Sequence, residues 1–348
     1  MDKRVIFAVA GAGKTSTIID SINEDSRCLI VTYTDNNTEQ LKNRIISKFG
    51  GIPSRVRVYS YFTFLYSFCY RPICGYKVKT KGINFDYPLP ASARFAKKDK
   101  LEHYLDSNRR LFANRIAKLL VDFDVIPEVT ERIEQFFDHV FIDEVQDFAG
   151  NDFNFLCELG KLNTNVLLVG DFYQHTFKTS IDQNIQKNLH NSFDEYCAKL
   201  KKSGFTIDLD SLSHSYRCSP SVCSFVEDNL GIKIGSHKDN EVQVRRLDCP
   251  DEIAEVYLDD SVIKLFFQTS NTYTGNVENW GKTKGLDHYN DVCVALNPTS
   301  YKAFMQGKLS SLAPLTRNKL YVACTRANGN LYFVEQKMLI QFKKQVRI

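Results

Sequence analysis

The sequence predicts an α/β fold in which two sheets of parallel strands are covered by helices. Apolar runs of strand length recur along the 348 residues and alternate with segments of helical pattern. Such alternation predicts parallel strands joined by right-handed crossovers. A glycine-bearing turn follows the first apolar run, and a cluster of acidic residues follows a later one, as expected where sheets of this kind bind ligands. The length suits two domains.

The expected elements can be placed along the chain. The first half is expected to hold strands at Val5–Val9, Cys28–Thr32, Arg55–Tyr59, His139–Asp143 and Asn165–Val169, with helices between them such as Thr38–Phe49. The second half repeats the pattern, with strands at Phe205–Leu209, Glu241–Leu247, Ser261–Phe267, Asp291–Leu296 and Leu331–Val334 and with helices at Pro220–Asn229 and Thr316–Arg326. The chain therefore reads as two sheets in succession.

The turn after the first strand predicts phosphate binding. It reads Ala10-Gly11-Ala12-Gly13-Lys14-Thr15. The two glycines let the backbone curl around phosphates, Lys14 reaches the terminal phosphates, and Thr15 can hold magnesium. Ala8 stands where the full phosphate-loop pattern has glycine, so this segment alone leaves a chance glycine-rich turn as the alternative.

The acidic cluster after the fourth strand predicts hydrolysis of the bound nucleotide. It comprises Asp143, Glu144 and Asp147, with Gln146 between them. Asp143 is expected to hold the magnesium ion that bridges the phosphates, and Glu144 to orient and deprotonate the attacking water. The alternative is a solvated acidic turn. It is less favoured, because the chain also has the apolar strand and the phosphate loop that such an acid pair would serve.

Seven segments, in chain order, resemble the motifs of superfamily 1 helicases of the UvrD/Rep type. They are Ala8–Thr15, Cys28–Asn36, Asp143–Asp147, Val169–Gln174, Ser213–Arg217, Thr283–Asp287 and Lys319–Ala327. The resemblance implies two RecA-like domains, ATP with Mg²⁺ as cofactors, and 3′→5′ movement on single-stranded DNA or a tailed duplex. It leaves open whether the chain prefers DNA or RNA. It also leaves ATP against GTP open, because the segment that reads adenine in the family has no counterpart here.

The resemblance also implies roles for residues outside the phosphate loop. Gln174 would sense the γ-phosphate, Arg217 would reach it, and Arg326 would be the arginine finger. Tyr33 stands where a base-stacking aromatic is expected, with Thr34 beside it, and Phe177 matches a base-stacking tyrosine. Gln146, Gly285 and Asp287 are assigned to the nucleotide site.

The resemblance places the first domain at 1–203 and the second at 204–348. Only 64 positions separate Arg217 from Gly281, the interval in which the family inserts its accessory 2B domain, so that domain is expected to be absent. The first domain has room for an insertion at about 62–121, between the phosphate loop and the acidic cluster.

The expected insertion is basic and begins with aromatic residues. From Arg55 to Lys118 the sequence has 14 basic and four acidic residues, a net charge of +10 against +4 for the whole chain. A patch of this kind is typical of phosphate-backbone binding, and Lys97 and Lys98 are candidates for it. The aromatics, Phe64 among them, either stack on bases or form core, and core aromatics are the commoner case.

The ten cysteines form no CxxC pair, which argues against a zinc ribbon and favours free thiols. No apolar run approaches the ~20 residues of a membrane span, and no signal peptide is recognised, so we expect a cytoplasmic protein without a membrane partner.

Two functions fit these observations. The first is a DNA-stimulated ATPase of helicase type, in a defence or repair complex, in which ATP hydrolysis drives closure of the two domains and translocation. The second is a nucleic-acid-sensing subunit that gates a partner nuclease and unwinds little duplex. The brevity of the chain and the wording of Tyr59–Leu65 and Thr316–Tyr321 resemble the helicase-like subunit of the Gabija antiphage system, which favours the second function.

Overall fold

The structure is a computed structural model that describes residues 1–177, 185–286 and 288–344. The chain folds into two compact units. The first comprises Met1–Ile6, Lys14–Gly170 and Lys178–Asp208, and the second comprises Phe7–Gly13, Asp171–Phe177 and Leu209–Ile348. The backbone therefore passes between the units several times, and part of the phosphate loop packs with the second unit.

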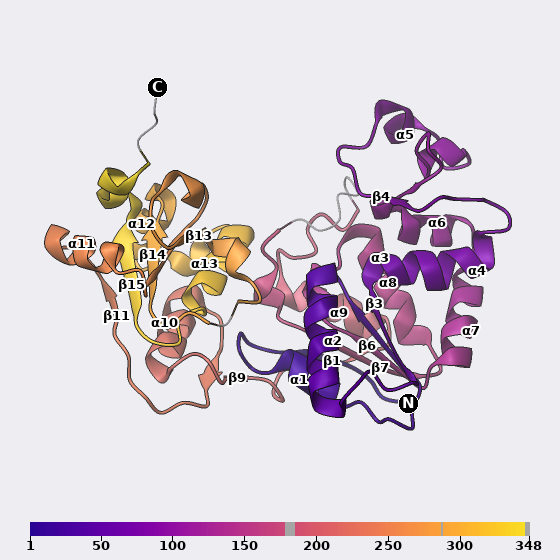
Figure 1. Cartoon of the computed structure of the whole chain (residues 1–348), viewed down its shortest axis with the longest axis horizontal. Helices are drawn as coiled ribbons and strands as arrows, with labels where there is room; N and C mark the ends of the chain where they lie inside the picture. The colour runs from indigo at the N-terminus through magenta and orange to yellow at the C-terminus, as the bar shows by residue number, and fades with distance from the viewer. Residues whose placement is uncertain (178–184, 287, 345–348) are drawn as a thin grey trace. The chain divides into compact units, whose positions relative to one another are not determined.

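The first unit contains a six-stranded parallel sheet with the order β3-β2-β6-β7-β1-β8 (Figure 1). The strands are β1 (Lys3–Phe7), β2 (Cys28–Thr32), β3 (Val56–Ser60), β6 (His139–Ile142), β7 (Asn165–Gly170) and β8 (Thr206–Asp208). All five residues of β2 are buried, as expected for a central strand with both faces covered. The expected parallel architecture is confirmed for this half.

Helices of the first unit start and stop at recognisable signals. In α2 (Asp35–Phe49), Thr34 caps the N-terminus and Gly50 ends the helix in the left-handed conformation, with φ of 75°. The α-helices outside the insertion are also α1 (Lys14–Asp20), α7 (Ile126–Phe136), α8 (Gly150–Glu158) and α9 (Phe193–Lys202), while α6 (Ile116–Asp122) ends the insertion. These helices supply the crossovers that the parallel strands require.

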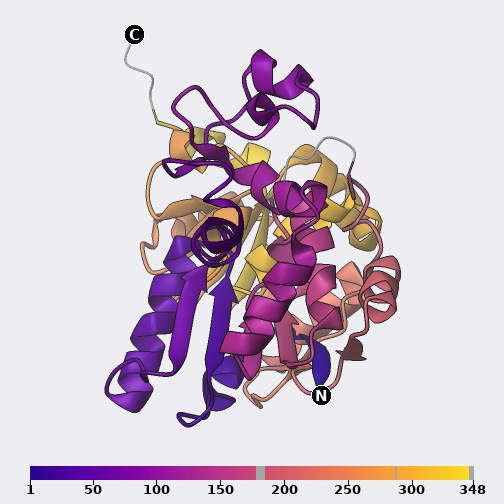
Figure 2. The same ribbon diagram turned by 90° about the vertical axis from the view of Figure 1, so that its right-hand side faces the viewer.

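The part of the inserted segment around β4 and α5 projects away from the main sheet, as both views show (Figures 1 and 2). The inserted segment begins with α3 (Tyr61–Thr63) and a π-helical stretch, Phe64–Tyr70. It continues through α4 (Arg71–Cys74), β4 (Ile83–Asn84), α5 (Ala91–Phe95), the 3₁₀ turn Leu101–His103 and β5 (Leu111–Phe112). β4 and β5 pair as a small sheet of their own, so the segment has local structure apart from the main sheet.

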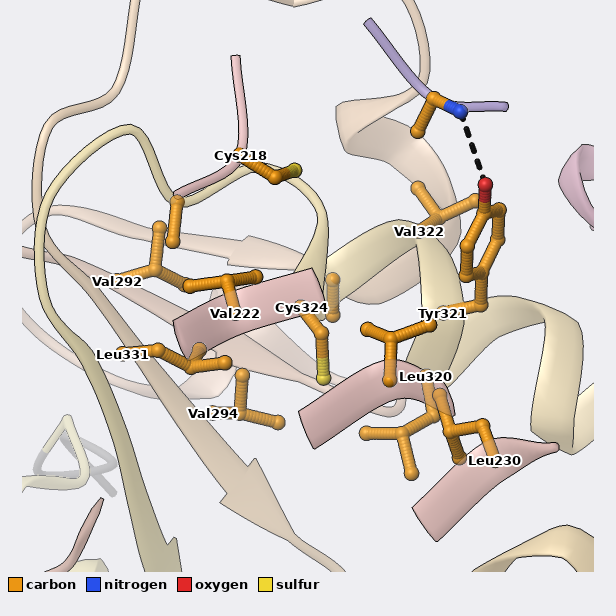
Figure 3. Packing of buried hydrophobic residues seen from close by; sticks show 14 of the residues in the cluster. Cys218, Val222, Leu230, Val292, Val294, Leu320, Tyr321, Val322, Cys324 and Leu331 are labelled. Atoms are coloured by element: carbon orange, nitrogen blue, oxygen red, sulfur yellow. Dashed lines mark hydrogen bonds between the residues drawn. The ribbon is translucent and has the colours of Figure 1, made fainter. Parts of the chain in front are cut away.

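The second unit contains a five-stranded parallel sheet with the order β11-β15-β14-β12-β13. Its strands are β11 (Val244–Arg246), β12 (Ile263–Phe266), β13 (Val277–Asn279), β14 (Val292–Leu296) and β15 (Leu331–Glu335), and its helices are α10 (Pro220–Leu230), α11 (Pro250–Leu258), α12 (Pro298–Met305) and α13 (Pro314–Cys324). A short pair, β9 (His214–Ser215) and β10 (Gly235–Ser236), lies outside the sheet. Side chains of α10, α13 and β14 form one buried cluster (Figure 3).

One expected strand belongs to the other half of the fold. Phe205–Leu209 was expected to open the second sheet, and this expectation is wrong. β8 instead pairs in parallel with β1 and forms the edge of the first sheet, with Ile207 opposite Val5. The apolar pattern of a short strand does not tell which sheet it joins, because that choice depends on contacts far away in the sequence.

No helix in the described part of the chain is long and apolar enough to cross a membrane.

Candidate nucleotide-binding site

The phosphate loop has the backbone shape that its sequence predicts. Gly11 and Gly13 have φ of 73° and 88°, a region that residues with a side chain rarely adopt. Lys14 begins α1 and is half-buried. Its ammonium group has no hydrogen bond or ion pair with any other described residue. A half-buried lysine without a partner, next to a glycine loop, is a ready binding group for an anion.

Two hard oxygen atoms, one from Thr15 next to this lysine in the sequence and one from Asp143, lie close together in the first unit. The Thr15 Oγ1 atom is 3.5 Å from Asp143 Oδ2, and the Asp143 side chain is buried. Hydroxyl and carboxylate oxygens are the ligands that Mg²⁺ prefers, and the ion keeps its remaining positions for water and phosphate. The two residues therefore fit a magnesium ion bound together with a nucleotide. The described residues contain no cluster of three acidic, histidine or cysteine side chains that would bind a metal by itself.

Glu144 is held in an unusual backbone conformation. Its φ and ψ are 57° and 48°, in the left-handed region, although it has a side chain. A residue in this region costs on the order of 1–3 kcal/mol and persists where surrounding contacts impose it, often at functional sites. Its own N–H donates to Asp143 Oδ1 at 2.9 Å, and Gln146 Nε2 donates to its carboxylate. The strained turn places the two carboxylates at successive positions with fixed orientations.

Two side chains near the C-terminal end of the first unit hold the acidic turn in place through hydrogen bonds. His190 Nε2 donates to the carbonyl oxygen of Gln146 at 2.9 Å, and the Tyr196 hydroxyl donates to that of Val145 at 3.0 Å. Burial lowers the pKa of His190 to about 4, so its ring is neutral at pH 7. A Cβ added at Gly170 would meet Gln146 Oε1 at 2.3 Å, so only glycine allows β7 to end this close to the turn. The pattern of the sequence around the turn did not reveal these supports.

A tyrosine hydroxyl connects the phosphate loop with a second acidic residue inside the second unit. The Ala10 N–H donates to the Tyr321 hydroxyl oxygen at 2.9 Å, and this hydroxyl donates to Asp171 Oδ2 at 3.0 Å (Figure 3 shows the first bond). Burial and the adjacent Asp171 raise the pKa of Tyr321 well above its usual value, so the hydroxyl keeps its proton. The other carboxylate oxygen of Asp171 accepts from Tyr173 N–H at 3.1 Å. Sequence analysis missed Tyr321, although it lies inside the last of the seven motifs.

Gly11 also packs closely against the segment that carries Arg217. A Cβ at Gly11 would lie 2.8 Å from both Arg217 Cβ and Ser215 Oγ, and Tyr216 N–H donates to the Gly11 carbonyl oxygen at 3.0 Å. The Ser215 hydroxyl oxygen accepts from the N–H groups of Arg217 and Cys218 at 3.1 and 3.0 Å. Glycine is therefore required at position 11 by space as well as by conformation.

The two candidate arginines differ in accessibility. Arg217 is half-buried, and its Nη1 donates to the Thr325 carbonyl oxygen at 3.0 Å. Arg326 is only 1% exposed, and its guanidinium donates to the carbonyl oxygens of Val322, Thr283 and Leu286. Arg326 therefore holds together the segments around it in this structure.

The remaining candidates for the nucleotide site are placed unevenly. Gln146 is fully buried beside Glu144, and Gln174 is buried at the end of the 3₁₀ turn Phe172–Gln174. Ala12 is buried in the phosphate loop. Gly285 has φ of 82°, and Asp287 lies outside the described residues. The roles of these residues stay predictions.

Two of the candidate nucleic-acid contacts are aromatic rings inside the first unit. Tyr33 is 7% exposed, stacks on Tyr61 with centroids 5.5 Å apart, and donates its hydroxyl proton to Asp152 at 3.3 Å. Phe64 is 1% exposed and stacks on Phe68. Neither ring is accessible to a base in this structure. Thr34, beside Tyr33, uses its hydroxyl as the N-cap of α2, accepting from Asn37 N–H at 3.2 Å.

The other candidates are accessible. Phe177 is 44% exposed, with Lys284 Nζ 5.7 Å from its ring centroid. Lys97 and Lys98 are exposed in the insertion. Sequence analysis passed over Tyr216, which is 64% exposed and stacks on His237 with centroids 4.1 Å apart. Its position directly before Arg217, in the motif that resembles the family, was the available signal.

The glycine loop with its unpartnered lysine, the Thr15–Asp143 pair and the two parallel sheets are features of a P-loop nucleotide-binding fold. Residues 88–192 match the UvrD/REP helicase N-terminal domain family. No curated protein matches the chain.

Three solved structures are similar to the chain at 14% identity. The PRRSV helicase has a TM-score of 0.47, with 97% of this chain and 53% of that chain covered. Arterivirus nonstructural protein 10, a helicase, matches in its complex with DNA with a TM-score of 0.48, over 96% of this chain and 61% of that chain. A crystal structure of the same arterivirus protein matches with a TM-score of 0.47, over 99% of this chain and 62% of that chain. The chain thus spans between 53% and 62% of their length, and a likeness this distant carries no argument about activity.

Proposed function

We propose that this protein is a nucleic-acid-dependent ATPase of the superfamily 1 helicase type. Two observations carry the proposal: the unpartnered ammonium group of Lys14, and the Thr15 and Asp143 oxygens that lie 3.5 Å apart. Lys14 would bind the terminal phosphates of ATP, and Thr15 and Asp143 would hold magnesium. When bound, the metal ion neutralises part of the phosphate charge.

Hydrolysis is proposed to depend on Glu144. Its carboxylate would accept a proton from the attacking water, and the strained backbone would keep that carboxylate in one orientation. Gln146 donates to the same carboxylate. The turn thereby separates the two tasks, with Asp143 binding the metal and Glu144 acting as the general base.

Three residues of the second unit are proposed to act on the γ-phosphate by the resemblance stated above. They are Gln174, Arg217 and Arg326. Exposure supports Arg217 more than Arg326, because Arg217 is half-buried while Arg326 is only 1% exposed. An arginine supplied to the transferred phosphate is worth about 10³ to 10⁵ in turnover in related systems.

The nucleic acid is proposed to be single-stranded DNA or the tail of a tailed duplex. Support comes from the charge of +10 between Arg55 and Lys118 and from the exposed side chains of Lys97, Lys98 and Phe177. Translocation in the 3′→5′ direction rests on the resemblance to UvrD/Rep helicases.

Nucleotide binding provides the first test. Lys14→Ala should abolish binding of a fluorescent ATP analogue in the presence of Mg²⁺, because the phosphates lose their charged partner. The matched control is Lys42→Ala, which changes a lysine on α2 rather than the one at the start of α1. This variant should bind the analogue like the wild type. Equal binding by Lys14→Ala and Lys42→Ala would remove Lys14 from the site. A parallel measurement with the corresponding GTP analogue shows whether the site prefers adenine or guanine.

A second candidate function is a regulatory subunit that senses nucleic acid and gates a partner nuclease, in a defence complex like Gabija or a repair complex. One observation favours it. The interval between Arg217 and Gly281 is occupied by α10, β10, β11, α11, β12 and β13, together with the loops that join them. The sheet strands and helices of the second unit account for the regular structure of this interval, which leaves no separate domain there to grip duplex DNA.

A further inference from the structure

The inserted segment of the first unit, together with Asn151 and Ile185, lines a pocket that the proposed ATPase reaction does not use. Its volume is about 390 Å³, within the range of sites that hold a small molecule or a single nucleotide. The wall includes Tyr87, Arg94 and Lys98 near α5, His103 from the following 3₁₀ turn, and Arg115 and Lys118 at α6. We call this cavity the insertion pocket.

The insertion pocket is positively charged. Four of its wall residues are arginine or lysine, and none of the described residues that line it is acidic. Arg115 is buried and donates to the carbonyl oxygens of Ala93 and His103, and Lys118 pairs with Asp122, whose carboxylate also attracts Lys98. Lys98, in contrast, is exposed and has no hydrogen bond or ion pair with the rest of the described chain. A concave wall with this charge concentrates anions.

One wall group in the insertion pocket lacks the partner that a buried polar atom needs. His103 is 8% exposed, and its Nδ1 lies 2.9 Å from the Ala96 carbonyl oxygen. A carbonyl oxygen can only accept, so Nδ1 carries the proton. Burial, together with the charges of Arg115 and Lys118, lowers the pKa of the ring, which is therefore neutral with Nε2 as an acceptor. Nε2 has no hydrogen-bond partner among the described residues.

An acceptor inside a cationic pocket calls for a ligand that combines negative charge with an N–H or O–H donor. Inorganic phosphate at neutral pH supplies the negative charge, but it is a poorer source of the hydrogen-bond donor that His103 Nε2 needs. A nucleoside phosphate satisfies both, because its base or sugar donates while its phosphate meets the cations. The Tyr87 ring, 59% exposed at the wall, adds a flat apolar face on which a base can stack.

We propose that the insertion pocket binds one nucleoside phosphate unit. Arg94 and Lys98 contact the phosphate, His103 Nε2 accepts a hydrogen bond from the base or sugar, and Tyr87 covers the base. The unit is either a free nucleotide or one nucleotide of a bound single strand. The second source rests on the proposed function, and the first does not.

Titration calorimetry of the full chain with deoxycytidine monophosphate tests the proposal. The Lys14→Ala background keeps the probe out of the ATP site. The monophosphate should bind more tightly than inorganic phosphate or deoxycytidine. Lys98→Ala should weaken its binding about tenfold, the cost of one charge-assisted contact. Lys97→Ala is the matched control, because Lys97 is the neighbouring exposed lysine and does not line the pocket. It should leave the affinity within twofold.

His103→Leu separates the donor contact from charge. It should remove the preference for deoxycytidine monophosphate over inorganic phosphate while phosphate binding persists. The exposed Lys98 side chain keeps the test valid if His103→Leu does not fold. No binding of the monophosphate, or equal effects of Lys98→Ala and Lys97→Ala, would overturn the proposal.

A competition arm identifies the source of the ligand. An oligodeoxycytidine single strand that displaces the monophosphate shows that the pocket holds part of a strand, and failure to displace it shows that the pocket takes free nucleotide. The binding assay requires no ATP turnover. A chain without ATPase activity would therefore contradict the proposed function and leave the pocket standing.

Discussion

The Tyr321 hydroxyl illustrates how much one atom can connect at the residue scale. It accepts from the N–H of Ala10, 311 positions away in the sequence, and donates to Asp171. A buried donor or acceptor that loses its partner costs about 1–3 kcal/mol. The phosphate loop therefore owes part of its position to a side chain from α13.

Tyr321→Phe should lower the free energy of unfolding by about 1–3 kcal/mol, because it leaves Ala10 N–H and one Asp171 oxygen without this partner. Urea unfolding measures the change. Tyr301→Phe is the control, since the Tyr301 hydroxyl has no hydrogen bond within the described residues. If the two variants lose the same stability, the Tyr321 bridge contributes nothing.

Single residues were predictable where their meaning lies in short motifs. Lys14, Thr15, Asp143 and Glu144 were recognised because the chemistry of a phosphate loop and an acidic turn is local in sequence. The burial of Phe64 and of Arg326 was not predictable in the same way. Whether an aromatic or an arginine meets solvent or core depends on segments far along the chain.

At the scale of elements, central strands were easier to predict than edge strands. Cys28–Thr32 has the bounds that were expected, because a strand covered on both faces is apolar throughout. β13 (Val277–Asn279) was missed, and β8 was assigned to the wrong sheet. Both are three-residue edge strands whose existence depends on the neighbouring strand rather than on their own composition.

The anchoring of the acidic turn by His190 makes a prediction for acid stability. Above pH 6.5 the ring is neutral in both the folded and the unfolded chain. As the pH falls from 6.5 to about 4, the unfolded chain takes up a proton that the folded chain, with a pKa of about 4, does not. Unfolding then becomes easier by roughly 3 kcal/mol, at 1.36 kcal/mol per pKa unit.

His190→Gln should remove this loss, because an amide can still donate to the Gln146 carbonyl oxygen but does not titrate. The measurement is the free energy of unfolding of wild type and variant at pH 7, 5.5 and 4.5. The exposed His237→Gln serves as control and should follow the wild type. Parallel curves for His190→Gln and wild type would show that His190 does not link stability to pH.

At the scale of the whole molecule, the proposed function couples strand binding to ATP hydrolysis, whereas residues 217–281 contain no separate domain that would grip duplex DNA. Splitting a base-pair step costs about 1.4 kcal/mol on average. ATP hydrolysis can supply that energy only if a separate element holds the duplex while the strand moves, and the interval after Arg217 carries only elements of the second unit's own fold.

The purified chain should therefore displace little of a labelled strand from a tailed duplex, even where the same tail stimulates ATP turnover. Gel-based strand displacement with ATP and Mg²⁺ measures it, and Lys14→Ala gives the background. Efficient displacement of long duplexes by the chain alone would mean a self-sufficient helicase and would remove the regulatory candidate.

Steady-state ATP turnover, with and without single-stranded DNA, tests the central claim most directly. The wild-type chain should hydrolyse ATP faster when the strand is present. Glu144→Gln should reduce turnover at least about a hundredfold, the usual loss on removal of a general base, while still binding ATP. Glu241→Gln, an exposed glutamate of the second unit, should retain wild-type turnover. The account would be contradicted by a wild-type chain that hydrolyses no ATP, or by Glu144→Gln turnover within a few-fold of the wild type.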